Sequence, residues 1–171
     1  MSLERLWAGW RGEYVAGVTA EDDGGARCVF CRILTSGEPD DVTLVVWRGE
    51  RCVAILNLFP YTSGHLMVLP VRHVGELEEL APEEASEVWA TVTAGVRALK
   101  EAYRPDGLNV GINLGRAAGA GIPGHFHVHC LPRWTADSNF MTTVAEARVL
   151  PEALSATYDK LRAAWPGAGG A

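Results

Sequence analysis

The sequence has few basic residues, few cysteines and no long apolar run. Its 171 residues carry 15 Lys and Arg against 21 Asp and Glu, a formal net charge of −6. A general nucleic-acid-binding protein normally presents a basic face, so this class of partner is disfavoured, while a local cationic pocket for a small phosphorylated ligand remains open. The longest apolar runs, such as residues 66–69, are far too short to cross a bilayer, which disfavours a membrane protein.

The first residues also lack the apolar core of a signal peptide, since residues 1–15 contain four charged side chains. We therefore expect a cytoplasmic protein, in which the four cysteines are thiols or metal ligands rather than disulfides. The length predicts one domain, 1–171, with an N-terminal arm (1–27), a core (28–140) and a C-terminal extension with a helix (141–171).

Short apolar or alternating runs predict strands, and a longer periodic pattern predicts a helix. The strands are expected near 43–48, 51–57, 65–70, 108–114 and 125–131. The helix is expected at 82–103, where Pro82 suits the first helical position and apolar residues recur at helical spacing. A second helix fits 150–165. Strands broken by one long helix predict an α+β fold with a largely antiparallel sheet.

Three of the five histidines lie in one predicted strand, HFHVHCL at 125–131. Side chains alternate across a strand, so His125, His127 and His129 share one face and the apolar residues between them share the other. We interpret the apolar face as core. The three imidazoles must then face a cleft, a metal ion or solvent.

Three interpretations of this histidine face are open. It is a polar surface, a metal centre or a site of nucleophilic catalysis. Side chains at i and i+4 on a strand diverge by roughly 13 Å, so at most two of the three histidines can bind one ion. In the catalytic interpretation a neutral imidazole attacks phosphorus, while its neighbours hold the non-bridging oxygens and protonate the leaving group.

The segment NLGRAAGAGIPG (113–124) leads directly into the histidines and favours the catalytic interpretation. Its four glycines let backbone N–H groups approach an anion closely. Arg116 and Arg133 add positive charge on either side of the histidines.

A Cys-x-x-Cys pair, Cys28 and Cys31, indicates either a metal site or a redox pair, and no βαβ pattern surrounds it. A zinc site needs two more ligands, for which His73 and His125 are candidates. The other two cysteines, in predicted strands, are interpreted as small core residues.

With these residues in view, the sequence resembles the histidine triad (HIT) family of nucleotide hydrolases and transferases. Residues 125–131 match its signature His-φ-His-φ-His-φ-φ, where φ is apolar, and residues 55–80 and 107–121 resemble two further blocks. The resemblance covers roughly residues 28–140. It implies a HIT-like fold, in which a mostly antiparallel five-stranded sheet is accompanied by one long helix and a C-terminal helix.

The resemblance also implies roles for individual residues. His127 is the nucleophile on the α-phosphorus, His129 lies beside the phosphate and His65 supports the triad through hydrogen bonds. Asn57 matches the position that contacts the ribose, and Asn113 matches a polar phosphate contact.

The nucleotide's phosphates are expected along the glycine loop, including Gly119 and Gly121. Four apolar residues are expected to form the purine slot, and plain core packing is their alternative interpretation: Phe30, Ile33, Ile55 and Leu56. The family often has glutamine in an Ala-Gly-Gln segment before the triad. Residues 118–121 read AGAG instead, so we expect backbone amides to replace that leaving-group contact.

Some HIT proteins carry a structural zinc on two cysteines, a later histidine and the first triad histidine. Here Cys28, Cys31, His73 and His125 fill these positions, so the resemblance implies structural Zn²⁺.

Residues 6–14 and 132–141 resemble those of bacterial diadenosine tetraphosphate phosphorylases and hydrolases, rather than of the smaller nucleoside phosphoramidases. The implied activity is cleavage of a dinucleoside polyphosphate through a nucleotidyl-His127 intermediate, with inorganic phosphate or water as acceptor. The alternatives are a phosphoramidase that releases adenosine monophosphate (AMP) from amines, and a non-catalytic nucleotide-binding module. Dimerisation is usual for the family, so we expect a homodimer that contacts through the 82–103 helix.

Overall fold

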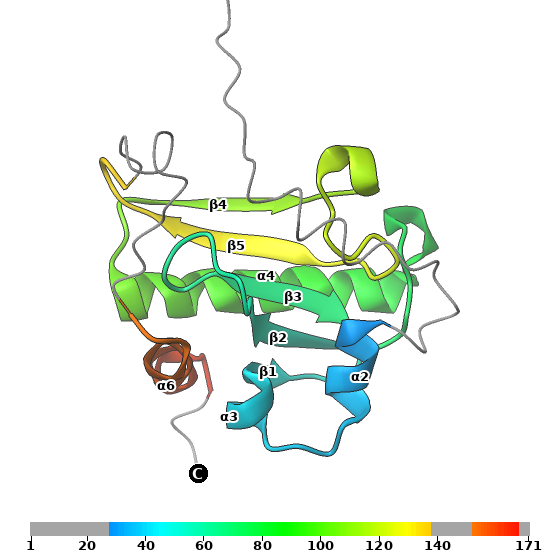
Figure 1. Ribbon diagram of the computed structural model, residues 1–171, viewed down its shortest axis with the longest axis horizontal. Helices are drawn as coiled ribbons and strands as arrows, with labels where there is room; N and C mark the ends of the chain where they lie inside the picture. The colour runs from blue at the N-terminus through cyan, green and yellow to red at the C-terminus, as the bar shows by residue number, and fades with distance from the viewer. Residues whose placement is uncertain (1–27, 138–151, 168–171) are drawn as a thin grey trace, which may run out of the picture.

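The protein is built around a five-stranded antiparallel sheet. The computed structural model describes residues 28–137 and 152–167. The strands are β1 (Val45–Arg48), β2 (Cys52–Leu56), β3 (Leu66–Pro70), β4 (Gly107–Ile112) and β5 (Val128–Arg133). They follow the order β1-β2-β3-β5-β4 across the sheet (Figure 1), and each neighbouring pair is antiparallel.

Helices surround this sheet. Those described are α2 (Val29–Thr35), α3 (Asp40–Thr43), α4 (Pro82–Tyr103) and α6 (Leu154–Ala164), with short 3₁₀ turns η1 (Leu77–Glu79) and η2 (Arg116–Ala118). The long helix α4 runs along one face of the sheet and packs on β2, β3 and β5 (Figure 1). Helix α6 packs beside α4 and β1. None of the described helices combines the length and the apolar character that a bilayer-spanning segment needs.

The predicted α+β class and antiparallel sheet are confirmed, and α4 begins and ends at the predicted residues. All five predicted strands are present, with ends shifted by at most three residues. The largest shift is in the triad strand, which was predicted from residue 125 but begins at Val128. The preceding residue Phe126 donates its N–H to the Val74 carbonyl at 2.6 Å, beyond the end of β3. The first two triad histidines therefore lie just before the regular sheet ladder.

The second predicted helix is α6, which begins at Leu154 rather than at residue 150. The predicted N-terminal arm and residues 141–151 of the extension lie outside the described residues. Helices α2 and α3 were not predicted. Helix α2 has only seven residues, no side-chain cap at Cys28 and no acidic residue in its first turn, so the usual signals of a helix start are missing.

The sheet separates two apolar clusters, and this separation orients the histidines. The larger cluster joins α4 and α6 to one face of the sheet and includes Phe126, Val128 and Cys130. The smaller cluster, centred on Phe30 and Met67, lies on the other face. The predicted alternation is thus confirmed: the apolar residues of the triad segment pack toward α4, which leaves the histidines on the opposite face.

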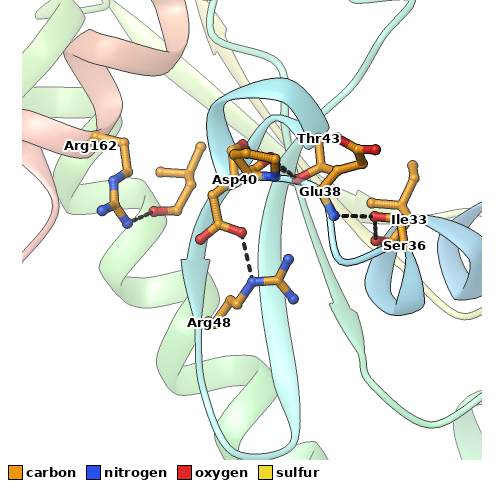
Figure 2. A network of polar contacts seen from close by, with 9 residues as sticks. Ile33, Ser36, Glu38, Asp40, Thr43, Arg48 and Arg162 are labelled. Atoms are coloured by element: carbon orange, nitrogen blue, oxygen red, sulfur yellow. Dashed lines mark hydrogen bonds and ion pairs between the residues drawn. The ribbon is translucent and has the colours of Figure 1, made fainter.

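Polar contacts fix the segment that joins α2 to β1 (Figure 2). Arg48 at the end of β1 donates from Nε to Asp40 Oδ1 at 2.8 Å, which holds the first residue of α3. Between the two helices, the Glu38 N–H donates to Ser36 Oγ at 3.2 Å and closes the turn. These contacts hold α3 against β1.

Candidate active site and metal centre

A cavity of about 590 Å³ is lined by residues of α2, α3, β2 and β3, the loop after β2 and the glycine loop. His127 and His129 also line it. Seven of the eight residues predicted to bind nucleotide line the cavity: Phe30, Ile33, Ile55, Leu56, Asn57, Gly119 and Gly121. Gly119 has φ 92°, a left-handed conformation that favours glycine. The predicted slot, ribose and loop positions are therefore brought together around two histidines.

Asn113 is the eighth predicted residue, and it does not line the cavity. It is half-buried and lies one residue beyond the last ladder pair, Ile112 with Val128. Continuing that register places Asn113 level with His127 on the neighbouring strand. Of the two expected arginines, Arg133 is engaged elsewhere, because its guanidinium pairs with Asp137 and Asn109.

The sequence did not single out several other residues of the cavity. Val42 on α3, Leu58, Phe59 and Tyr61 in the loop after β2, and Met67 on β3 also line it. Phe59 is 57% exposed, so it forms part of the rim rather than the interior. Apolar residues in a short loop follow no helical or strand periodicity, and only the fold shows that they face a cavity.

His127 has a proton position fixed by the main chain. Its Nδ1 lies 2.7 Å from the carbonyl oxygen of His125, and since a carbonyl can only accept, Nδ1 carries the proton. In the neutral imidazole Nε2 then holds the lone pair. Burial lowers the pKa of His127 below its usual value, opposed by the same backbone hydrogen bond, and the side chain is 5% exposed. His127 is therefore a neutral imidazole with a nucleophilic Nε2 at neutral pH.

His129 and His65 form a chain of directed hydrogen bonds. The Tyr61 N–H donates to His65 Nδ1 at 3.1 Å, so this nitrogen accepts and His65 Nε2 carries the proton. His65 Nε2 lies 2.9 Å from His129 Nδ1 and donates to it. The neutral His129 must then carry its own proton on Nε2. It is a hydrogen-bond donor beside the neutral His127 imidazole, and acyl and phosphoryl transfer sites use such a pairing of a donor with a lone pair.

The first triad histidine belongs to a different group. The ligand atoms of Cys28, Cys31, His73 and His125 all lie within 4.8 Å of one another. His125 donates from Nε2 to the Pro70 carbonyl at 2.9 Å, which leaves its Nδ1 lone pair directed at the cysteines. This Cys/His cluster can hold a metal ion, and its two histidines favour the metal interpretation of the cysteine pair over the redox interpretation.

The fold is α+β with an antiparallel sheet, and an inner strand of that sheet presents alternating histidines to a cavity. These features define a histidine triad protein. The HIT domain family matches residues 39–136, and the chain belongs to this family.

The chain also resembles curated proteins, in one case along nearly its whole length. It is 40% identical to a Mycobacterium tuberculosis protein named AP-4-A phosphorylase, over 95% of this chain and 85% of that one. It is 34% identical to the asymmetrical bis(5′-nucleosyl)-tetraphosphatase of Schizosaccharomyces pombe, over 54% of this chain and 50% of the relative.

Solved structures agree on the fold. A Zn-bound histidine triad family protein from Mycobacterium smegmatis superposes with a TM-score of 0.67 and 31% identity, over 82% of this chain and 94% of its own. A hypothetical histidine triad nucleotide-binding protein from Sulfolobus tokodaii gives a TM-score of 0.66 at 27% identity, over 80% and 91% of the two chains. The HIT-like fold expected from the sequence is therefore confirmed.

Proposed function

We propose that this protein is a HIT enzyme that cleaves dinucleoside polyphosphates, of the diadenosine tetraphosphate type, through a nucleotidyl-His127 intermediate. The observation that carries the proposal is the neutral His127, which has its lone pair on Nε2. This residue lines a cavity large enough for a nucleoside. Its relative named AP-4-A phosphorylase, matched along nearly the whole chain, supports the substrate class.

The mechanism follows from the proton positions. The adenine occupies the slot beside Phe30, and the phosphates lie along the glycine loop. His127 Nε2 attacks the α-phosphorus, the bond from phosphorus to the bridging oxygen breaks, and a nucleoside polyphosphate leaves. His129 donates from Nε2 to the oxygens on which charge develops. In the intermediate, the Nδ1–H bond to the His125 carbonyl stabilises the positive imidazole. Phosphate or water then attacks the same phosphorus and releases His127.

The products identify both the reaction and its acceptor. Incubation with diadenosine tetraphosphate should give ATP plus ADP with inorganic phosphate as acceptor, or ATP plus AMP with water. Parallel incubation with adenosine phosphoramidate tests the alternative activity. Turnover of the phosphoramidate alone would overturn the proposed substrate class, and binding without turnover of either compound would identify a non-catalytic module.

The pH dependence of turnover should report the buried His127. Only the neutral imidazole attacks, so activity falls as the pH drops through the His127 pKa. Because burial lowers that pKa, we expect the acid midpoint of kcat/KM to lie below the ordinary histidine value of about 6.5. The check is kcat/KM from pH 4 to pH 8. A midpoint above that value, or no acid limb, contradicts the assignment of His127 as nucleophile.

Replacing His65 tests the hydrogen-bond chain. His65→Ala removes the donor to His129 Nδ1, so His129 can adopt the wrong tautomer. We expect kcat to fall by about one to two orders of magnitude with little change in KM, as for other partners that orient functional histidines. The control is Glu78→Ala, an exposed substitution in η1. An unchanged kcat in His65→Ala shows that the tautomer of His129 does not matter.

We also propose that the ion at the Cys/His cluster is structural Zn²⁺. Tetrahedral zinc with two sulfur and two nitrogen ligands has sulfur–nitrogen edges of about 3.6 Å. The corresponding edges here are 3.4 Å for Cys28 to His125 and 3.3 Å for Cys31 to His73. We expect elemental analysis of purified protein to find about one zinc per chain, and Cys31→Ser to lose it. Full zinc retention by that variant contradicts the ligand set.

The oligomeric state and location are proposals of the same kind. We propose a homodimer in the cytoplasm. Trp89 on α4 is a large apolar side chain that is 49% exposed, and a second copy can cover it. Light scattering of the purified protein measures the molar mass directly.

A further inference from the structure

Helix α2 belongs to both sites of this molecule. Cys28 precedes its first turn and Cys31 lies within it, and both contribute to the Cys/His cluster. Val29, Phe30 and Ile33, on the same seven-residue helix, line the nucleotide cavity. One short helix therefore carries both a wall of the base slot and half of the metal ligands.

The other two ligands come from the sheet. His73 follows β3, and His125 precedes β5. Their segments are firmly attached: His125 bonds the Pro70 carbonyl, and Arg72 forms paired hydrogen bonds of 2.9 and 2.7 Å to the Glu84 carboxylate of α4. A bound metal thus joins two ligands of a helix to two ligands of the sheet.

Helix α2 has little stability of its own. Seven residues are too few for an isolated helix, and no side chain caps its start. Phe30 is 4% exposed and packs its ring edge-on against both His125 and His127, with centroids 5.4 Å apart in each case. The position of Phe30 therefore depends on the packing of α2 and on its cysteine anchors.

We propose that a metal ion at Cys28, Cys31, His73 and His125 sets the affinity of the cavity for a nucleotide base, by fixing α2 as one wall of the base slot. The proposal rests on the function proposed above and assigns the metal no part in the chemistry. Without the metal, α2 samples positions in which Phe30 leaves the slot. Only the molecules in which α2 holds the competent position then bind the nucleotide directly. The apparent affinity is therefore the intrinsic affinity multiplied by the fraction of such molecules.

The experiment measures AMP binding by calorimetry to full-length protein that is zinc-loaded, chelator-stripped or reloaded with zinc. AMP occupies the base slot without turnover, so the readout is independent of activity. We expect stripping to weaken AMP binding by at least about tenfold and reloading to restore it. Arg32→Ala, an exposed change on the same helix, should behave as wild type in all three states.

A second variant separates the slot from the rest of the fold. Phe30→Ala removes the largest side chain that α2 contributes to the slot. The AMP affinity of this variant should therefore be weak in the loaded state and change by less than about threefold on stripping. Hydrogen exchange should show that stripping deprotects the amides of α2 while those of β2, β3 and β5 stay protected.

Each outcome decides between the proposals. Equal AMP affinity in loaded and stripped wild type overturns this inference and leaves the proposed function standing. Unfolding of the whole sheet on stripping also overturns it, because the metal would then hold the fold rather than one wall. Loaded protein that binds no AMP at all overturns the proposed function, and this inference with it.

Discussion

His127→Ala is expected to lower the turnover of diadenosine tetraphosphate by a factor on the order of 10⁴ or more, the scale seen when a covalent nucleophile is removed. In the proposed mechanism, His127 is the one protein group that forms a bond to phosphorus. Alanine has no lone pair to offer, and its neighbour His129 carries its proton on the nitrogen that would have to attack, because His65 donates to the other one. Neighbouring groups therefore do not replace it.

The measurement combines steady-state kinetics with acid-quenched labelling by substrate radiolabelled at the α-phosphorus. Wild type should yield labelled protein, and His127→Ala should yield none. AMP should still bind to His127→Ala, since the four apolar residues of the predicted purine slot are unchanged. A variant that keeps wild-type turnover would falsify the nucleotidyl-His127 intermediate.

Leu99→Ala is expected to cause a large loss of stability. Leu99 is fully buried on α4, in the cluster that packs behind the triad segment against Phe126 and Val128. Truncating a buried leucine removes apolar burial and leaves a void, which costs about 2 to 5 kcal/mol of unfolding free energy. For a chain of this size the melting temperature should fall by roughly 5 to 15 °C.

Calorimetric melting is the check, with Lys100→Ala as the matched control. Lys100 is the next residue along α4 and is exposed, so its loss should change the unfolding free energy by less than about 0.5 kcal/mol. Below the melting transition, Leu99→Ala should retain turnover, because the histidines lie on the other face of the sheet. A shift no larger than the control's contradicts the core position of Leu99.

The sequence was sufficient for features that rest on periodicity or on a resemblance. Alternation placed Phe126 and His127 on opposite faces, and helical spacing located α4 to the residue. The four residues of the Cys/His cluster were predicted from the family pattern, and the structure brings their ligand atoms together.

The sequence was insufficient where tertiary contacts decide the outcome. No pattern marks α2, because seven residues without a cap become a helix only when Phe30 and the cysteines dock. The contribution of Tyr61 is likewise invisible, since its main-chain N–H donates to His65 and its ring packs on the same imidazole, and only the fold brings these groups together. The strand end at Val128 depends on where the partner segment leaves the sheet at Val74.

The three triad imidazoles take their proton positions from main-chain atoms: the Pro70 and His125 carbonyls fix the first two, and the Tyr61 amide fixes the third through His65. Main-chain atoms are common to every residue type, so, apart from His65, this set of donors and acceptors does not depend on which side chains lie nearby. Transplanting the three histidines onto another strand would not carry it along. An engineer who wants this chemistry elsewhere must copy the path of the backbone.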